Sequence, residues 1–367
     1  MKSSQQLVIV LLLLGIAIIA PAVVNYIVDP YQIFRPKSDG TSELRSNTRF
    51  QVAGLIRTYL ANPEFGFDTV IIGDSHGLNF AQSRVQEALG TGGVLKFCMS
   101  GSKGKTHRIV AERALEEPTL HRVIWELGNH YSNPDPNVVS QWHTFPSYLY
   151  GDWPGLARYL FNVDIFQESL KSMRSNADKY GPQGDDWASW FTNERKWGEL
   201  RDDFHATLPE LNSVISELQP TRPNDVETLR TYQSTDGYPI IDLVAEIVRA
   251  NPDVEFDFFV PPNSILRYAT LTNEQYARMF FMRRYAVDVL GSLPNAHLYA
   301  FDDTPEVVCN LDFYKDQGHY HRDINDWIID SIALGNHELT SENIEKYERT
   351  WLEMIRDYTI PDDKLGK

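Results

Sequence analysis

A serine lies in the segment Gly73-Asp74-Ser75-His76, where an apolar run predicted to be a strand gives way to a predicted helix. A hydroxyl at such a junction lies beside backbone N–H groups at the positive end of the helix dipole, which favour the negative charge that develops during acyl transfer. Near the other end of the chain, Asp316 lies three residues before His319. The two segments together supply a nucleophile, a general base and an acid that can orient the base.

This chemistry requires these residue types. A serine hydroxyl is barely nucleophilic at neutral pH without a base, and a neutral imidazole is suited to accept its proton. Asp316 can accept a hydrogen bond from Nδ1–H of His319 and leave Nε2 facing Ser75. His321 and Asp312 are the alternatives for the base and the acid, and the spacing favours the first pair.

The overall composition is that of a globular protein. The chain has 367 residues, enough for one large domain or two, with 42% hydrophobic and 23% charged residues. Its 50 acidic residues outnumber the 34 basic ones, which gives a net charge of −16. Such a charge repels phosphate backbones, so nucleic acid is not expected as a partner.

An apolar run extends from Leu7 to Val28, with Asn25 as its only polar interruption. As a helix, its 22 positions span roughly 33 Å, enough to cross a bilayer. The segment Ala20-Pro21-Ala22 also fits a signal-peptide cleavage site, but the run is longer than a signal core and continues past that site. We expect residues 1–28 to be a transmembrane anchor or an uncleaved signal, with the rest of the chain outside the cytoplasm.

Cys98 and Cys309 are the only cysteines. They are either buried apolar residues or, in an oxidising compartment, partners in a disulfide that would brace the site. Neither the cysteines nor the ten histidines follow the spacing of a zinc site, so no metal and no other cofactor is expected.

Short apolar runs alternate with amphipathic segments through much of the chain. The runs lack strict alternation, which is typical of parallel strands covered on both faces. This pattern predicts an α/β fold with a layered, parallel sheet. Strands are predicted at 69–72, 94–97, 123–127, 254–260 and 297–301, and helices at 48–60, 76–89, 104–117, 238–250, 273–291 and 322–334.

The expected organisation has four parts. Residues 29–47, with prolines, a glycine and scattered charge, are expected to form a linker. The α/β domain is predicted to cover 48–337, and a C-terminal helix and tail follow at 338–367. At about 130–237 the alternation stops, so a mostly helical insertion is expected there.

Within this insertion, helices are predicted at 155–178 and 190–220. Tryptophans are also concentrated in it: Trp142, Trp153, Trp187, Trp190 and Trp197. They form either the core of an inserted subdomain or a groove in which some of them stack on sugar rings.

Two further segments lie between the serine and the histidine. The run 94–98 leads to Ser100-Gly101-Ser102, and the run 123–127 leads to Gly128-Asn129. With Gly-Asp-Ser first and Asp-x-x-His last, the chain resembles the SGNH (GDSL-type) hydrolase superfamily, which carries four such blocks in this order.

The resemblance implies that Ser75 is the nucleophile, His319 the base and Asp316 the acid that holds its ring. It also implies an oxyanion hole made by the N–H groups of Ser75 and Gly101 and by the side chain of Asn129. It implies the SGNH form of the α/β fold expected from the pattern, which is a three-layer parallel sheet of the flavodoxin-like kind.

Several of these positions have other interpretations. Asn129 could simply close a turn, and Gly101 could be a glycine with positive φ. Asp74 could cap a helix, and we interpret it as a turn residue rather than a catalytic one. His130 stands where the superfamily usually has Asp, and both His76 and His130 are either pocket residues or solvated loop residues.

Lys103 and Lys105 place positive charge beside Gly101, which would attract an anionic substrate. The same segment is superficially similar to a phosphate-binding loop. That motif would require a glycine where the chain has Met99, so a nucleotide-binding domain is not expected.

The single anchor, the proline-containing linker and the large insertion make the chain similar to membrane-anchored envelope proteins of bacteria, such as the alginate O-acetylation proteins and the teichoic-acid D-alanylation protein. This resemblance implies a periplasmic or cell-surface serine esterase or O-acyltransferase that acts on an envelope or exported polysaccharide through a Ser75 acyl-enzyme. Its partners would be the glycan, an acyl donor and a membrane-bound O-acyltransferase. The alternative is an accessory subunit without activity, which His130 favours and the intact Ser75, Asp316 and His319 disfavour.

Overall fold

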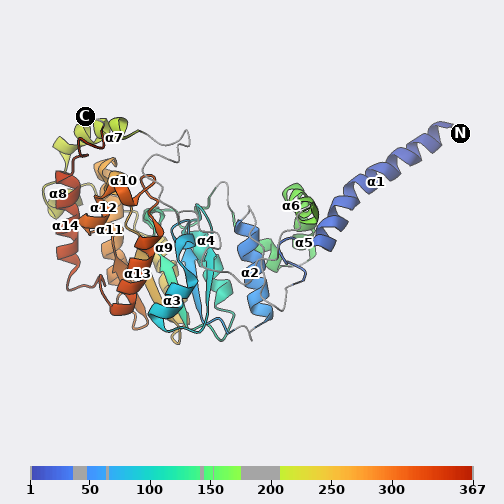
Figure 1. Ribbon diagram of the computed structural model, residues 1–367, viewed down its shortest axis with the longest axis horizontal. Helices are drawn as coiled ribbons and strands as arrows, with labels where there is room; N and C mark the ends of the chain where they lie inside the picture. Colours follow the sequence, from blue (N-terminus) through green and yellow to red (C-terminus); the bar gives the residue numbers. More distant parts are fainter. Residues whose placement is uncertain are drawn as a thin grey trace. The chain divides into compact units, whose positions relative to one another are not determined.

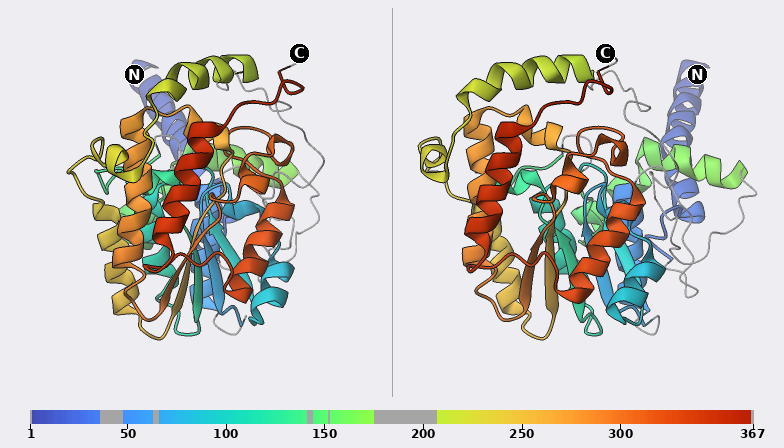
Figure 2. Two further views of the ribbon diagram at one scale, coloured as in Figure 1. Left: turned by 90° about the vertical axis from the view of Figure 1, so that its left-hand side faces the viewer. Right: turned by 60° about the vertical axis from the view of Figure 1, so that its left-hand side comes forward.

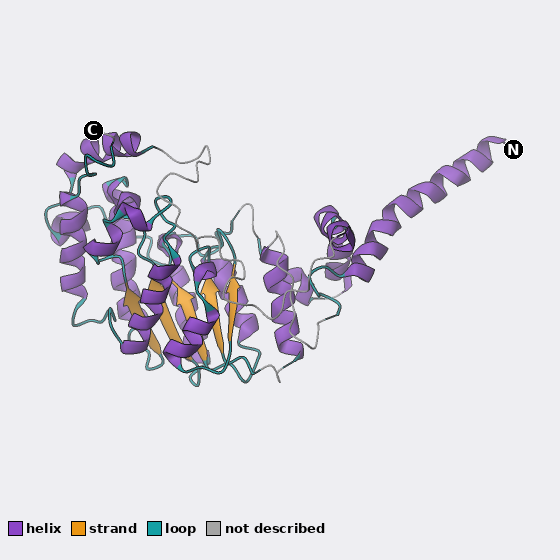
Figure 3. Cartoon of the chain, in the orientation of Figure 1, coloured by secondary structure: helices purple, strands orange, loops and turns teal. Residues whose placement is uncertain are grey.

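The structure, a computed structural model, describes residues 2–35, 48–62, 66–140, 144–151, 153–174 and 207–365. The chain divides into two compact units: an N-terminal unit, Met1–Phe65 with Thr144–Gln183, and an α/β unit, Gly66–His143 with Gly184–Lys367. Figure 1 follows the chain from the N-terminus to the C-terminus, and Figure 3 shows the sheet of the α/β unit.

Five parallel strands form this sheet, in the order β2-β1-β3-β4-β5. All strand residues except Arg122, Glu255 and His297 are buried, because helices cover the sheet, and this explains the continuous apolar runs in the sequence. The predicted α/β fold with a parallel sheet is confirmed, and every strand begins and ends within one residue of its prediction. The strands are β1 (Thr69–Gly73), β2 (Val94–Cys98), β3 (Arg122–Glu126), β4 (Glu255–Val260) and β5 (Ala296–Ala300).

Helices pack on both faces of the sheet (Figure 2). On one face, α3 (Gln82–Leu89) contacts α13 (Arg322–Leu334); on the other, α9 (Pro239–Ala250) contacts both α4 (Gly104–Ala114) and α11 (Asn273–Val289). The remaining helices of the unit are η2 (Gly77–Asn79), η3 (Asn129–Ser132), α7 (Leu208–Leu218), η5 (Gln219–Thr221), α8 (Val226–Arg230), α10 (Ile265–Ala269), α12 (Pro305–Val308), η6 (Leu311–Phe313) and α14 (Ile344–Asp357).

The prediction of one continuous helix over 76–89 is wrong. The short 3₁₀ helix η2 and the α-helix α3 are separated by Phe80 and Ala81, both of which are extended. The ammonium group of Lys96, buried in β2, donates to the carbonyl groups of Leu78 at 3.0 Å and Phe80 at 3.1 Å. Because a continuous helix would use these two carbonyls for its own hydrogen bonds, the buried lysine favours the break.

The C-terminal segment is part of the α/β unit. Helix α14 contacts α8, α10 and α11, and its Trp351 is fully buried among aromatic rings of that unit. The segment expected to be a helix and tail at 338–367 therefore contributes to the core.

The N-terminal unit contains α1 (Lys2–Val28), α2 (Thr48–Ala61), η4 (Ser147–Tyr150), α5 (Trp153–Leu160) and α6 (Val163–Arg174). Within α1, Gln5–Val28 is long and apolar enough to cross a membrane, a property that a signal sequence shares. The carboxylate of Asp29 accepts the N–H groups of Ile33, Phe34 and Arg35 and so closes the turn after α1.

These boundaries differ from those expected. Helix α2 and the segment with α5 and α6 group with α1, not with the α/β unit. The predicted helix over 155–178 is two short helices, and of the predicted helix over 190–220 the structure describes only α7 and the start of η5. Of the five tryptophans, only Trp153 lies among the described residues, and it is exposed.

Candidate active site

Ser75 lies in the turn after β1, at the carboxyl edge of the sheet. The strand order changes direction between β1 and β3, and α/β proteins bind ligands at such switch points. A carboxylate oxygen of Asp74 accepts the His76 N–H at 3.0 Å and closes the turn, which fits the turn role expected for Asp74. Because a three-residue 3₁₀ helix follows, the helix dipole expected at Ser75 is largely missing.

A loop after β5 brings His319 to Ser75. The Ser75 Oγ lies 2.8 Å from His319 Nε2, and His319 Nδ1 lies 2.6 Å from Oδ2 of Asp316. The other carboxylate oxygen of Asp316 accepts the N–H groups of Gly318 and His319, both at 2.8 Å. Asp316 therefore fixes the loop and the ring together, and the hydrogen on Nδ1 leaves Nε2 free to accept the serine proton.

The surroundings of Asp316 keep it ionised. Burial opposes ionisation, but the hydrogen bond and charge of His319, together with the two backbone N–H groups, hold the pKa of Asp316 well below its usual range. The alternative pair lies elsewhere: His321 caps α13 through the N–H of Asp323, and Asp312 forms an ion pair with Lys364.

Asn129 begins η3 directly after β3, and it lines the same pocket as Ser75. Its Oδ1 accepts a hydrogen bond from Nη2 of Arg283 at 3.2 Å. Arg283 is fully buried, donates to the carbonyl of Met279 and forms an ion pair with Asp302 at 2.5 Å. Because a guanidinium can only donate, Asn129 must present its oxygen to Arg283, which leaves its NH₂ group for the pocket.

Gly101 also lines the pocket, in the turn after β2. Its φ of +67° confirms the interpretation as a glycine with positive φ, and this conformation is compatible with an N–H group that donates to a ligand. Behind the turn, the buried Ser102 donates to the carbonyl of Gly73 at 3.1 Å and lies 2.7 Å from Nε2 of His107. These contacts tie the glycine turn to the serine turn.

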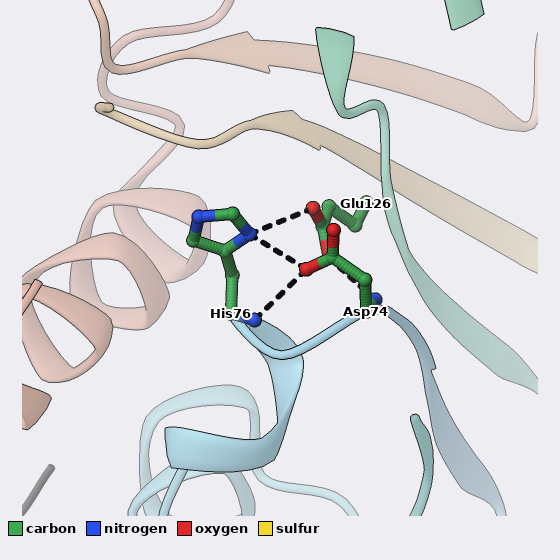
Figure 4. Close-up of side chains that lie close together, drawn as sticks. All are labelled: Asp74, His76 and Glu126. Carbon is green, nitrogen blue, oxygen red and sulfur yellow. Dashed lines mark hydrogen bonds and ion pairs between the residues drawn. The ribbon is translucent and has the colours of Figure 1, made fainter. Parts of the chain in front are cut away.

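Asp74, His76 and Glu126 form a cluster in the same pocket as Ser75, in which His76 and Glu126 are buried and Asp74 is partly exposed (Figure 4). His76 Nδ1 is 2.7 Å from Oδ1 of Asp74 and 3.0 Å from Oε1 of Glu126, and Glu126 Oε2 accepts the Asp74 N–H at 2.8 Å. The opposite ring nitrogen lies 3.0 Å from the carbonyl of Gly318. A Cβ at Gly73 would lie only 2.5 Å from Oε2 of Glu126, so the glycine makes room for this carboxylate.

The cluster holds a proton. The Gly318 carbonyl can only accept, and Asp74 and Glu126 can only accept when they are ionised, so both ring nitrogens of His76 then donate and the ring is an imidazolium. Burial disfavours this charge, but Asp74 and Glu126 outweigh it and raise the pKa of His76 well above its usual value. The same three residues could offer one ligand atom each to a metal ion, but their spacing of 2.7 and 3.0 Å is that of hydrogen bonds.

Glu126 should make the stability of the protein depend on pH. Burial and the neighbouring charge of Asp74 raise the pKa of Glu126 to about 7, against an ordinary value of 4.5. Because the folded protein holds the Glu126 proton more tightly than the unfolded chain, this group contributes its full stabilisation below pH 4.5. The contribution is lost as pH rises to about 7. We expect the unfolding free energy to fall across this range and to fall much less in Glu126→Gln, as measured by denaturant titration at a series of pH values. Equal slopes in the two proteins would contradict this assignment.

The pocket beside Ser75 has a volume of about 740 Å³. Of the lysines expected near it, Lys103 lines it and Lys105 does not. Two arginines that the sequence did not single out, Arg267 and Arg278, also line it. The charged groups of Lys103 and Arg267 have no partner among the described residues, so they give this part of the wall a positive charge.

His130 is a pocket residue, not a solvated loop residue. Its ring lies against His107 at a centroid distance of 5.2 Å, and burial together with the charge of His107 holds the pKa of His130 well below its usual value. It is therefore a neutral ring beside Asn129.

The cysteines are free thiols, so the disulfide considered for them is not formed. Cys98 is buried, and its sulfur lies 3.4 Å from the carbonyl of Ile71. A Cβ at Gly77 would come within 2.5 Å of this sulfur, which shows how closely η2 packs over it.

The sequence reasoning missed Glu126 and Arg283 as parts of the site. A signal for Glu126 was present, because an acidic residue interrupts the apolar run 123–127 and buried acids are rare without a partner. Arg283 lies in the middle of α11, where a long basic residue usually faces solvent, and no local pattern distinguishes it.

No protein-family model matches the chain, and no curated protein matches it in sequence.

Proposed function

We propose that this protein is a serine esterase or O-acyltransferase that acts through an acyl-enzyme on Ser75. The observation that carries this proposal is the continuous relay from Ser75 Oγ through the His319 ring to Asp316, with distances of 2.8 and 2.6 Å, at the wall of a large pocket. An unreactive binding protein has no physical need for such an arrangement. The order of the four segments, similar to that of SGNH hydrolases, supports the same reaction class.

In the first half-reaction, Ser75 Oγ attacks the ester carbonyl while His319 Nε2 takes its proton. The carbonyl oxygen becomes an oxyanion, to which Asn129 Nδ2 and the N–H groups of Gly101 and Ser75 donate. As the tetrahedral intermediate collapses, His319 gives the proton to the departing alcohol oxygen. The ester C–O bond breaks, and the acyl group remains on Ser75.

In the second half-reaction, a water or a sugar hydroxyl loses its proton to His319 and attacks the acyl carbonyl. The proton then returns to Ser75 as the ester bond to the enzyme breaks. Water makes the protein an esterase, and a sugar hydroxyl makes it a transferase. A pocket of 740 Å³ has room for both an acyl group and part of an acceptor.

The substrate proposed from the resemblance is an O-acylated or O-acylatable polysaccharide of the cell envelope, with α1 as a membrane anchor and the α/β unit outside the cytoplasm. A fluorophosphonate probe tests the reaction class in the full-length protein. Covalent labelling at Ser75 would support an activated serine. Failure of the folded protein to label would favour the alternative, an inactive accessory subunit of a membrane-bound O-acyltransferase.

Asn129→Ala is expected to lower kcat by two to three orders of magnitude, because one oxyanion donor stabilises the transition state by about 3–4 kcal/mol. Asn129→Asp is the matched variant. It keeps an acceptor for Arg283 but places an oxygen where the donor was. We expect it to be at least as slow as the alanine variant. If the aspartate variant retained full activity, Asn129 would serve only to hold Arg283.

Removal of the unpaired positive charges should affect anionic substrates selectively. Lys103→Ala and Arg267→Ala are each expected to raise the KM for an acidic ester about two- to fivefold and to leave the KM for a neutral ester unchanged. Lys105→Ala is the control, since Lys105 lies two residues after Lys103, in the first turn of α4, but does not line the pocket. Equal effects on both esters would show that the charges do not select the substrate.

A further inference from the structure

Large apolar side chains are exposed on the hairpin formed by α5 and α6 in the N-terminal unit. The exposed fractions are 64% for Trp153, 54% for Phe161, 66% for Val163 and 66% for Met173. Single exposed apolar residues are common, but four within 21 residues on two consecutive helices and their turn require an explanation.

Helix α6 has three distinct faces. At 100° per residue, its side chains fall on three separate stripes. The stripe buried within the unit includes Ile165, Glu168 and Ser169. The polar stripe is exposed and consists of Asp164, Gln167, Lys171 and Arg174. The apolar stripe is at least partly exposed and consists of Val163, Phe166, Leu170 and Met173.

The hairpin is fixed to α1 through Asn25. The side chain of Asn25 is fully buried and donates to the carbonyls of Leu160 at 2.8 Å and Asn162 at 3.2 Å, in the turn between α5 and α6. Its oxygen accepts the hydroxyl of Ser169 at 2.9 Å. The one polar residue in the apolar run of α1 thus binds the hairpin through both its NH₂ group and its oxygen.

The position of Asn25 along α1 sets the depth of the hairpin in any membrane that α1 crosses. From Gln5, where the apolar span begins, to Asn25 the helix rises about 30 Å, which is the thickness of the hydrocarbon core of a bilayer. When α1 crosses a membrane, Asn25 and the turn that it holds lie at the boundary between acyl chains and headgroups. Figures 1 and 2 show α6 crossing α1 near the C-terminal end of α1, an arrangement that places α6 along the membrane plane.

We propose that α5 and α6 form an interfacial hairpin that binds the phospholipid surface, with Trp153, Phe161 and the apolar stripe of α6 among the headgroups and upper acyl chains. Tryptophan and amphipathic helices favour this zone because it offers both apolar and polar surroundings. The polar stripe then faces water. The proposal depends on the insertion of α1, which is part of the proposed function, and it does not depend on chemistry at Ser75.

The test uses the full-length protein in vesicles of phosphatidylethanolamine and phosphatidylglycerol, with an environment-sensitive fluorophore on single cysteines. Labels go on the apolar stripe in Val163→Cys and Met173→Cys and on the polar stripe of the same helix in Asp164→Cys and Gln167→Cys. Leu11→Cys reports insertion of α1. All variants also carry Cys309→Ser, because the partly exposed Cys309 would react with the fluorophore. Cys98 is fully buried and is kept.

We expect lipids brominated near the headgroup to quench the Val163 and Met173 labels at least about twofold more than the polar-stripe labels, and aqueous iodide to show the reverse order. Equal iodide quenching at all four positions, with the Leu11 label shielded, would overturn the proposal while leaving the anchor intact. An exposed Leu11 label would overturn both the hairpin proposal and the anchor.

Shielding of the apolar stripe in native membranes but not in lipid vesicles would assign the stripe to a protein partner and overturn lipid binding. Fluorophosphonate labelling of the same samples reports separately on Ser75, so failure of the catalytic proposal is distinguishable from failure of this one.

Discussion

Ser75→Ala and His319→Ala are each expected to lower kcat for ester hydrolysis by roughly four to six orders of magnitude. The hydrogen bond of 2.8 Å between Ser75 Oγ and His319 Nε2 makes the two groups one functional unit. Without the base, the hydroxyl is a weak nucleophile; without the hydroxyl, the base has only water to activate. The double variant should therefore be no slower than the slower single variant.

The measurement is steady-state hydrolysis of a small chromogenic ester, with fluorophosphonate labelling in parallel. Ser100→Ala is the matched control, because Ser100 is another serine at the wall of the pocket but is not a member of the relay from Ser75 through His319 to Asp316. It should keep activity within a few-fold of the unmodified protein. A Ser75→Ala protein with near-normal turnover would show that another group attacks the ester.

Asp316→Asn is expected to lower kcat by about 10⁴ with little change in KM. An asparagine can still accept the N–H groups of Gly318 and His319 with its oxygen, so the loop should keep its shape. Its NH₂ group would then face Nδ1 of His319 and donate to it. That contact forces the hydrogen onto Nε2, which can no longer accept the serine proton.

Asp312→Asn is the control for this change. Asp312 lies four residues earlier and pairs with Lys364, away from the relay. Its replacement should leave kcat unchanged. Comparable losses in the two variants would indicate that the segment is sensitive to any change of charge, and the argument from the tautomer would fail.

Most of the sheet could be predicted from the sequence because its strands are buried on both faces and read as short continuous apolar runs. The relay was also accessible, since its three members occupy two short segments at the ends of strands. Turns at the carboxyl edge of a parallel sheet meet in space, whatever their distance in sequence.

Other features depend on contacts that no local pattern contains. The helix predicted over 76–89 is broken because Lys96, from the neighbouring strand, takes two of the carbonyls that it would need. Arg283 reaches Asn129 from a helix more than 150 residues later in the chain. The grouping of α2 with α5 and α6 likewise arises from tertiary packing, which the boundary prediction at residue 48 did not include.

Gly73 and Glu126 constrain one another, since a β-carbon at position 73 and a carboxylate at position 126 would occupy the same space. Gly73→Ala should therefore damage the site through a steric conflict with Glu126, although the backbone at position 73 is ordinary strand. The combination of Gly73→Ala with Glu126→Ala should remove the contact with the carboxylate and leave only the Cβ of residue 126, at 3.0 Å, while losing the proton that the cluster shares. Other chains with a buried imidazolium of this kind should therefore carry two features together. One is a Gly-Asp-Ser-His turn after a strand, and the other is an acidic residue at the end of the second strand that follows it.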